Sequence, residues 1–473
     1  MSRRTRAVIA VCAAAFLAFL DTTIVNVSFP NIAEHFPKAS RSDLSWVLDA
    51  YFIVIAAFLV PAGEIADRVG RKRIFLWAVY AFIATSVLCA VAPTWQALVA
   101  ARVLQGIAAA VIAPVSMALM LPEFPGEQRS QAVGIWGAAA ALAAASGPPL
   151  GGLLVDVSDW RLIFLVNIPI GIAIVALGRT ALVESVDAEA RASGLPDMVG
   201  ALAAVFGLGA LALAIVEGES WGWGSSRIVG AFVLAAVLVA VVVQRCRTHP
   251  KPIIEPDLMR IPSFRWGNVG TFLFAVAFFS MILGNILFLT GVWQYSILKA
   301  GLAVVPGPLA STFVAAPAGK LADRFGHRVV IIPGTISYAL GLLILRTTGA
   351  HPDYLGTWLP GQVLVGIGIG LAFPTFGAAA VQHIAPERFG SASAVNSAFR
   401  QFGAVVGTAV VIAIIGNPTT LQGALDVSDT AYAFGIVAAL LSCAAALMLK
   451  PSRVAAAPQP PTKFEAVDLE RTG

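Results

Sequence analysis

The chain has 473 residues, of which 58% are hydrophobic and 12% charged, and its mean hydropathy is +0.84. Soluble domains carry roughly 25% charged residues, so this chain has too little polar surface to cover a particle of its size in water. Its formal charge is +5, but no basic stripe interleaved with aromatic residues supports nucleic-acid binding. The composition therefore predicts an all-α integral membrane protein that binds no nucleic acid.

The sequence lacks the usual motifs for metals, cofactors and enzymatic chemistry. The four cysteines show no CxxC spacing, and none of the five histidines pairs with another at metal-ligand spacing. There is no GxxxxGK[ST] loop of an ATP-driven pump, no nucleophile elbow and no HExxH. We therefore expect no enzyme activity, no catalytic residues, no metal site and no cofactor.

The first predicted span follows the basic N-terminal segment MSRRTR. This start resembles a secretory signal, but it lacks the small-residue cleavage site that closes a short apolar region. The apolar run instead continues beyond the length of a signal and contains Asp21. We interpret it as an uncleaved first span.

Apolar runs long enough to cross a membrane, about 20 residues each, repeat along the whole chain. We predict fourteen spans, at residues 7–29, 44–62, 74–93, 95–121, 131–154, 161–178, 198–216, 227–244, 267–290, 299–317, 328–347, 355–380, 392–415 and 430–449. Most of the 31 Lys and Arg residues fall in segments on the same side as the N-terminus, which favours a cytoplasmic location for that side. The sequence thus predicts a multi-pass protein of the inner (plasma) membrane with both termini in the cytoplasm.

Two stretches of sequence occur twice. The run Gly63–Arg71 (GEIADRVGR) recurs as Gly319–His327 (GKLADRFGH), and Arg102–Gly106 (RVLQG) matches Gln362–Gly366 (QVLVG). Copies with the same membrane orientation predict two related six-helix bundles, and the separation of the copies leaves room for two inserted helices. The predicted divisions are an N-terminal bundle at 1–180, the inserted helices and a cytoplasmic loop at 181–265, a C-terminal bundle at 266–449 and a cytoplasmic tail at 450–473.

The first of these repeated runs lies at the inside end of the second span. The run predicts a tight turn, in which Gly63 and Gly70 allow close backbone approach. The Asp67 carboxylate lies among Arg68 and Arg71, where it can pair with an arginine or cap a helix. Two interpretations are open, namely a contact that holds the inside end closed in one state, or a positively charged topology anchor only. The corresponding residues of the second copy are Gly319, Asp323, Arg324 and Gly326.

The fifth span contains the run Ser146–Gly152 (SGPPLGG). Its glycines let neighbouring helices approach closely, and its tandem prolines remove backbone donors, which a helix in lipid tolerates only where neighbours satisfy the backbone. A packing kink alone would also explain the pattern. The motif residues are Gly147, Pro148, Pro149, Gly151 and Gly152.

Together these motifs resemble the major facilitator superfamily, and specifically its fourteen-span drug:proton antiporter branch, over nearly the whole chain to about Leu449. The resemblance implies a major facilitator fold, with two six-helix bundles plus two inserted helices. It also implies that GPPLGG is an antiporter motif and that Gly63–Arg71 is a gating motif. The run Trp160–Pro169 (WRLIFLVNIP) is a further marker of the branch, and we assign no chemistry to it.

The function implied by the resemblance is proton-coupled antiport, which exports small lipophilic, often cationic drugs by alternating access with a proton as the coupling ion. A dedicated exporter of one metabolite, lipid or self-made antibiotic on the same fold is an open alternative. A membrane enzyme or receptor with a transporter-like shell is a third reading, which the paired motifs disfavour. The expected partners are small lipophilic substrates and membrane lipids; the sequence carries no signal for oligomeric state and is compatible with a monomer.

Asp21 in the first span and Arg102 in the fourth are candidate proton-coupling residues. A carboxylate inside the membrane costs about 2.5–3.5 kcal/mol on insertion scales, so it should face the bundle interior or a wet cavity. Asp21 is then a proton carrier or, alternatively, a hydrogen-bonding hub. A buried Arg102 stays protonated, and it either stabilises a moving carboxylate or forms a fixed ion pair. Its counterpart in the second half is the neutral Gln362, which favours proton chemistry in the first half.

Asp49, near the outside end of the second span, is a third candidate for proton coupling. The resemblance leads us to expect a neutral polar residue at this position. Three readings of the carboxylate are open: it attracts a cationic substrate, it exchanges protons, or it is simply wet at the outer mouth.

A substrate cavity is expected near the bilayer midplane between the two bundles. For Arg400 and Gln401, hydrogen bonding between helices is an equal alternative to cavity lining. An aromatic residue such as Trp136 is more often part of the core or of the interfacial belt. The candidate lining residues are Asn26, Gln105, Trp136, Arg400 and Gln401.

Overall fold

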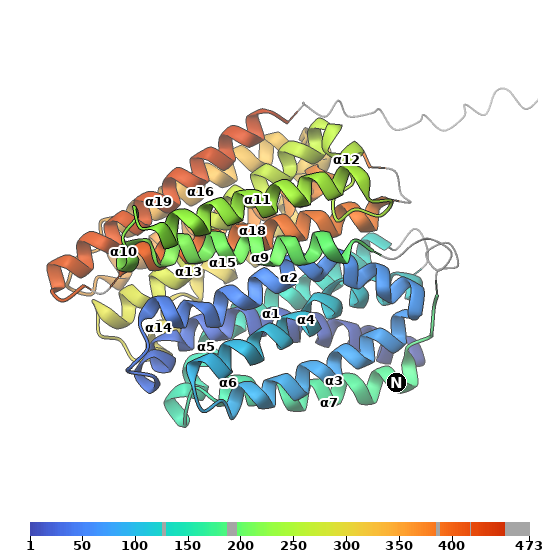
Figure 1. Cartoon of the computed structure of the whole chain (residues 1–473), viewed down its shortest axis with the longest axis horizontal. Coiled ribbons are helices and arrows are strands. Elements are labelled where there is room, and N and C mark those ends of the chain that lie inside the picture. The colour runs from blue at the N-terminus through green and yellow to red at the C-terminus, as the bar shows by residue number, and fades with distance from the viewer. Residues whose placement is uncertain (125–128, 187–195, 385–387, 417, 450–473) are drawn as a thin grey trace, which may run out of the picture.

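A computed structural model describes residues 1–124, 129–186, 196–384, 388–416 and 418–449. In this part of the chain, fourteen helices are long and apolar enough to cross a membrane, and they lie roughly side by side (Figure 1). The all-α membrane fold and the predicted number of spans are therefore confirmed. The predicted tail at 450–473 lies outside the described residues.

The first bundle contains six spans. Within it, α1 packs against α5 and α7, while α4 packs against both α2 and α3. The last span starts with the short helix α6, which leads directly into α7. The helices are α1 (Arg3–His35), α2 (Arg41–Val69), α3 (Arg71–Ala90), α4 (Trp95–Met120), α5 (Arg129–Val157), α6 (Leu162–Leu165) and α7 (Asn167–Ala181).

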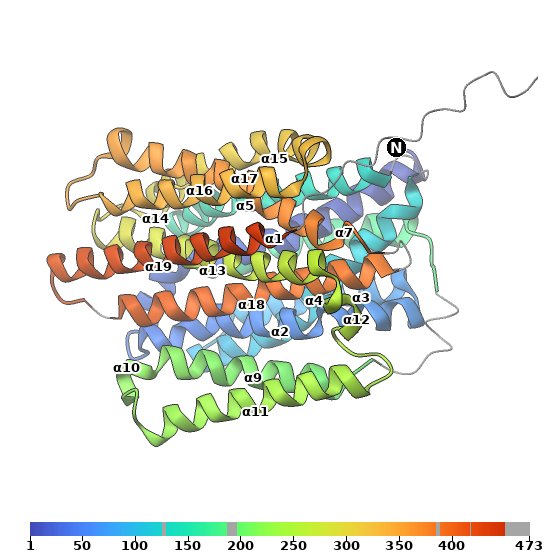
Figure 2. The same cartoon turned by 90° about the horizontal axis from the view of Figure 1, so that it is seen from above.

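The inserted pair is formed by α9 (Met198–Val216) and α11 (Ser226–Thr248), joined through α10 (Gly218–Trp221). These two helices lie side by side along one edge of the molecule, next to α2 (Figure 2). At the end away from α10, Asp197 links the two helices. Its carboxylate accepts hydrogen bonds from the Gly200 N–H of α9 (2.9 Å) and from Arg245 Nη2 of α11 (2.8 Å). Burial acts to raise the pKa of the Asp197 carboxyl, but these hydrogen bonds outweigh it and hold that pKa below its usual range.

The second bundle also contains six spans, and the short helix α12 leads into it. In this bundle α13 packs against α18 and α19, and α17 packs against α15 and α16. The fourth of its spans begins with a π-helical turn at Tyr354–Trp358. The helices are α12 (Pro256–Arg260), α13 (Pro262–Gly291), α14 (Ile297–Ala303), α15 (Pro306–Phe325), α16 (His327–Arg346), α17 (Leu359–Val381), α18 (Phe389–Ile415) and α19 (Leu421–Leu447).

Local sequence signals fix where several spans begin. At the start of α2, Ser40 and Asp43 form a capping box, in which the Ser40 Oγ accepts from the Asp43 N–H and the Asp43 carboxylate accepts from the Ser40 N–H, both at 3.0 Å. Thr94 and Ser225 cap α4 and α11 in the same general way. Such a cap typically contributes about 1 kcal/mol to stability. Here each cap fixes the residue at which a span begins after its loop.

The two bundles meet where α2 packs against α18, α5 against α14, and α1 against α13. We call the end of the molecule that holds the N-terminus and the α2–α3 and α15–α16 turns the terminal face, and the other end the opposite face (Figure 1). Every polar or charged residue placed deep between these faces must find its partners inside the protein.

Candidate functional site

A buried ion pair joins α1 and α4 in the middle of the first bundle. Arg102 Nη1 lies 2.6 Å from Asp21 Oδ2, and the two side chains are 1% and 0% exposed. Because both charges are removed from water, each depends on the other for neutralisation. Removing one member of such a pair typically costs about 3–5 kcal/mol.

Three neutral side chains complete the ring of contacts around this pair. Gln105 accepts from Arg102 Nη1 (2.7 Å) and donates to Asp21 Oδ1 (3.2 Å) and to the Ser86 Oγ (2.9 Å). The Asn167 Nδ2 donates to Asp21 Oδ1 (3.1 Å) and to the same Ser86 Oγ (3.2 Å). We call these five residues the Asp21 cluster, which draws together α1, α3, α4 and α7.

The second helix, α2, holds the arginine from another side. Arg102 Nε donates to the Val47 carbonyl oxygen at 3.0 Å, and its guanidinium lies 3.8 Å from the centroid of the Tyr51 ring. A desolvated cation over an aromatic ring gains about 2 kcal/mol. The arginine is therefore fixed in position by contacts with α2 as well as by its counter-ion on α1.

The structure brings together two of the three predicted proton-coupling residues, Asp21 and Arg102. Gln105, expected to line a substrate cavity, lies instead in the Asp21 cluster and is fully buried. Asn26 is also buried and donates to the Thr22 carbonyl of its own helix (2.8 Å).

Two members of the Asp21 cluster were not predicted. Asn167 lies in the WRLIFLVNIP run, which carried a signal of family membership but not of chemistry. Ser86 lies in an apolar stretch of α3, where nothing in the sequence singles it out. Only the fold brings these residues to the carboxylate.

Asp49 does not join the cluster. It is 0% exposed on α2 and forms no ion pair with any residue that the structure describes, and Ser45 one turn earlier is its polar neighbour. The reading that Asp49 is wet at an outer mouth does not hold in this conformation. Proton exchange and attraction of a cation remain predictions for it.

The first copy of the predicted gating motif forms the turn that connects α2 directly to α3. Gly70 ends α2 with φ +128°, a region that favours glycine, and its N–H donates to the Ala66 carbonyl oxygen (2.9 Å). Asp67 Oδ1 accepts from Arg71 Nε at 2.6 Å across the turn, with both side chains partly exposed. Gly63 has open space around it, so its role is not a close approach.

A residue far away in the sequence holds this turn. The Glu184 carboxylate, in the segment that leaves α7, accepts from the backbone N–H groups of Lys72 (3.0 Å) and Arg73 (3.1 Å) at the start of α3. A carboxylate is favoured at a helix N-terminus, where the N–H groups lack partners. A Cβ on Gly70 would lie 2.8 Å from Glu184 Oε1, so the glycine also makes room for this contact.

Replacing Gly70 by Ala is expected to lower the stability of the folded protein. A left-handed φ costs an L-residue about 1–2 kcal/mol, and the new methyl group would displace Glu184 from α3. The thermal unfolding midpoint of the purified protein in detergent measures the effect. Gly63→Ala is the control, since it adds the same methyl group to open space; equal midpoints for the two variants would contradict this account.

The second copy of the motif repeats the turn but not the ion pair. Gly326 ends α15 with φ +92°, and its N–H donates to the Ala322 carbonyl oxygen (2.8 Å). His327 stands where the first copy has Arg71, and among the described residues Asp323 forms no corresponding salt bridge. The other predicted residues, Arg324 and Gly319, lie on the same partly exposed end of α15.

The run predicted as an antiporter motif packs α5 tightly onto α1. A Cβ on Gly147 would lie 2.1 Å from Thr23 Oγ1, and one on Gly151 would lie 2.8 Å from Ile24 Cγ1. Both contacts follow Asp21 by only two or three residues along α1. The glycines therefore allow the helix that carries Asp21 to lie directly against α5.

The same motif also forms a contact between the two bundles. A Cβ on Gly152 would lie 2.5 Å from Leu298 Cα of α14, and one on Gly301 would lie 2.4 Å from the Pro148 carbonyl oxygen. Near the opposite face of the molecule, Arg41 Nη1 donates to the Gly416 carbonyl oxygen at 3.0 Å. The bundles are therefore in close contact near the opposite face.

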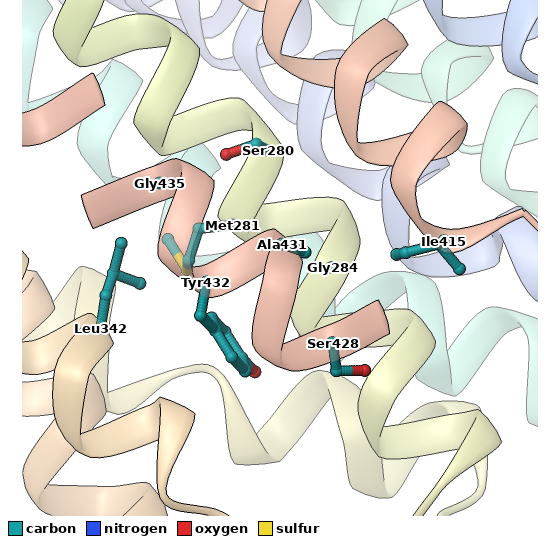
Figure 3. Close-up of a pocket in the computed structure, with 9 residues that line it drawn as sticks. All are labelled: Ser280, Met281, Gly284, Leu342, Ile415, Ser428, Ala431, Tyr432 and Gly435. Atoms are coloured by element: carbon teal, nitrogen blue, oxygen red, sulfur yellow. The ribbon is translucent and has the colours of Figure 1, made fainter. Parts of the chain in front are cut away.

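A mostly apolar cavity of about 70 Å³ lies between the bundles, beside the antiporter motif. The predicted cavity residues do not line it, but Pro148 does. Its lining includes Thr23, Val27 and Pro148 from the first bundle and Phe278, Asn285 and Gln362 from the second. A second pocket, of about 10 Å³ between α13 and α19 (Figure 3), has room for about one water molecule and does not suit a substrate.

Two of the predicted cavity residues, from different bundles, meet at one aromatic ring. The Trp136 ring of α5 lies edge-on to Phe19 with centroids 5.8 Å apart, and its Nε1 donates to the Ser116 Oγ (3.0 Å). The Arg400 guanidinium of α18 also lies 5.8 Å from the Phe19 ring. Its neighbour Gln401 is partly exposed.

Comparison with known proteins shows the same fold and related sequences. The model of the Major Facilitator Superfamily matches residues 11–408 and, in a second match, 268–469. The multidrug resistance protein Stp of Mycobacterium tuberculosis is 35% identical over 403 residues, 85% of this chain and 74% of that protein. The cephamycin export protein CmcT of Amycolatopsis lactamdurans is 32% identical over 465 residues, 97% of this chain and 94% of that protein.

A crystal structure with a similar fold is that of a bacterial homologue of the human lysosomal transporter Spinster, in an inward-facing and occupied conformation. It aligns with a TM-score of 0.64 at 16% identity and covers 95% of this chain and 97% of that chain. The family match and the relatives, together with fourteen apolar helices among the described residues, show a multi-pass membrane transporter rather than an enzyme. The chain belongs to the Major Facilitator Superfamily, and it is of the fourteen-span drug efflux type.

Proposed function

We propose that the protein is a proton-coupled antiporter that exports small lipophilic molecules across the plasma membrane by alternating access. The observation that carries this proposal is the fully buried Asp21–Arg102 ion pair at the centre of the first bundle. Efflux is supported by the relatives that are named for multidrug resistance and for cephamycin export. The terminal face, which is rich in Lys and Arg, faces the cytoplasm in this proposal.

The ion pair provides a switch between two protonation states. While Asp21 is ionised, it neutralises Arg102 and accepts from Gln105 and Asn167. A proton arriving at Asp21 removes the attraction and leaves the arginine charge without its counter-ion, so the arrangement of α1 against α4 becomes unfavourable. Each proton that crosses the membrane field contributes about 2.3 kcal/mol per 100 mV, which can drive substrate outward.

The packing of α1 against α5 connects Asp21 to the contact between the two bundles. Thr23 and Ile24 lie just beyond Asp21 and touch Gly147 and Gly151 of α5, and Gly152 of the same helix touches α14 of the other bundle. A shift of α1 on protonation is therefore transmitted to the contact near the opposite face. The apolar cavity lies beside that contact, and we propose that it accommodates part of the substrate.

A dedicated exporter of a single antibiotic is the second candidate. The specific support for it is the relative named as a cephamycin export protein, which covers 97% of this chain. Both candidates use the same proton site and differ only in the breadth of substrates.

Efflux of a panel of lipophilic dyes and antibiotics from cells that carry the protein tests the proposal. We expect faster efflux than in cells with empty vector, and we expect a protonophore to abolish the difference. Export of one compound only would favour the dedicated exporter. Efflux that continues unchanged with the protonophore would overturn proton coupling.

A further inference from the structure

Arg400 differs from the other deeply placed arginine in having no counter-ion. Its side chain forms no ion pair or hydrogen bond with any residue in the described part of the chain, and its guanidinium lies 5.8 Å from the centroid of the Phe19 ring. Arg102, by comparison, donates hydrogen bonds to Asp21, to Gln105 and to the Val47 carbonyl oxygen. Arg400 is also partly exposed rather than buried, and it lies on α18, which packs against α2 of the first bundle.

Among the described residues, no carboxylate on the helices that pack against α18 forms an ion pair with Arg400. Its own helix α18 contains no acidic residue, and neither do α9, α13 and α17, which pack against α18. On α2, which also packs against α18, Asp49 is 0% exposed, Asp43 accepts from the Ser40 N–H, Asp67 pairs with Arg71, and Glu64 is partly exposed without an ion pair to Arg400. On α19, Asp429 pairs with Arg346 and Asp426 accepts from Gln422. Asp21 is fully buried and paired with Arg102. A cation within a membrane protein is costly unless an anion neutralises it. The Arg400 guanidinium therefore lacks an anionic partner.

Aromatic side chains lie beside this unpaired charge. Phe19 and Phe16 lie on one face of α1 together with Cys12, and all three are partly exposed. Trp136 meets Phe19 from α5 and is held by its hydrogen bond to Ser116. A guanidinium next to aromatic rings suits a ligand with an anionic group and a planar apolar body, because arginine can donate two parallel hydrogen bonds to two oxygens of one oxyanion and the rings stack on the body.

We propose that Arg400 binds the anionic group, a carboxylate or sulfonate, of a lipophilic substrate whose ring system packs against Phe19 and Trp136. This inference rests on the proposed transport function and specifies the charge of the substrate. It differs from the expectation of often cationic substrates, since a cation at this place would be repelled by Arg400. Arg400 belongs to the second bundle, whereas Phe19 and Trp136 belong to the first. A substrate bound to these residues would therefore contact both bundles at once.

Two naphthalene dyes that share a phenylamino-naphthalene body test this inference. 8-Anilinonaphthalene-1-sulfonate carries an anionic group, and N-phenyl-1-naphthylamine is neutral. Binding of each dye to the purified protein is measured for the wild type, Arg400→Gln and Arg400→Lys. We expect the ratio of anionic to neutral dye affinity to fall about tenfold or more in Arg400→Gln, the scale of a charge-assisted hydrogen bond, and to be partly kept in Arg400→Lys.

Arg265→Gln is the matched control, because it removes the same charge from an exposed position near the start of α13. Its affinity ratio should equal that of the wild type. An equal loss of both dyes in Arg400→Gln would overturn the inference, since a gate or packing role affects all ligands alike. A wild-type protein that does not prefer the anionic dye would overturn it as well.

The failure of this inference can be separated from failure of the proposed function. Transport of the neutral dye driven by a pH gradient in vesicles tests proton coupling without reference to Arg400. Coupled transport of the neutral dye together with an unchanged affinity ratio would reject the anion site and leave the antiporter intact. Transport of the neutral dye by the wild type that does not depend on the pH gradient would reject the proposed antiport function.

Discussion

Replacing Asp21 by Asn is expected to abolish proton-coupled efflux while the protein still inserts in the membrane. Asparagine keeps the shape of the side chain and can still hydrogen-bond, but it cannot gain or lose a proton. It also leaves Arg102 without the counter-ion that lies 2.6 Å away in the native protein. Protonophore-sensitive efflux from cells, normalised to the amount of protein in the membrane, measures the loss.

Two further variants make this result specific. Asp429→Asn removes a carboxylate from a surface ion pair with Arg346, where both side chains are more than 40% exposed, and efflux should remain close to that of the wild type. Asp21→Glu keeps the carboxylate, and it should retain part of the coupled activity. An Asp21→Asn protein that still drives substrate against its gradient would exclude Asp21 as the essential carrier.

Replacing Gly152 by Ala is expected to prevent the bundles from closing near the opposite face. The added Cβ would lie 2.5 Å from Leu298 Cα, which is backbone and cannot move aside unless α5 and α14 separate. Overpacking costs about 1–3 kcal/mol, which lowers the ratio of closed to open states by a factor of roughly 5 to 160. Transport should fall strongly, because the cycle requires both states.

The change of state can be measured directly. Val27 lines the cavity between the bundles and is fully buried. A single cysteine at this position, in a chain without the native cysteines, should react faster with an impermeant maleimide in the Gly152→Ala protein. Gly137→Ala, on the same helix but in open space, is the control. Equal labelling rates in all three proteins would contradict the closing role of Gly152.

Much of the fold follows from patterns that depend on local sequence alone. Each span must contain about 20 apolar residues, so the fourteen spans could be located from hydropathy, although helices such as α1 extend beyond the apolar core at both ends. The two turns at Gly70 and Gly326 could be predicted because a positive φ after a long helix strongly favours glycine. The repeat of the motif then indicated two bundles.

The composition of the site was harder to predict, because the polar side chains of the Asp21 cluster come from four helices. Asp21 and Arg102 could be singled out as charges within apolar runs, and the structure brings them together. Ser86 and Asn167 are neutral, and their proximity to Asp21 depends on how α3 and α7 pack against α1. Glu184 was missed for a similar reason, since a carboxylate in a loop carries no signal until the chain places it at the start of α3.

The central claim is that substrate movement is tied to proton movement through Asp21. The most direct test uses purified protein in sealed vesicles that contain a pH-sensitive dye, with a substrate gradient but no initial pH difference or voltage. The account predicts that the wild type moves protons in the direction opposite to the substrate, and that the Asp21→Asn protein moves none. Substrate movement in the wild type without any proton movement would contradict the account.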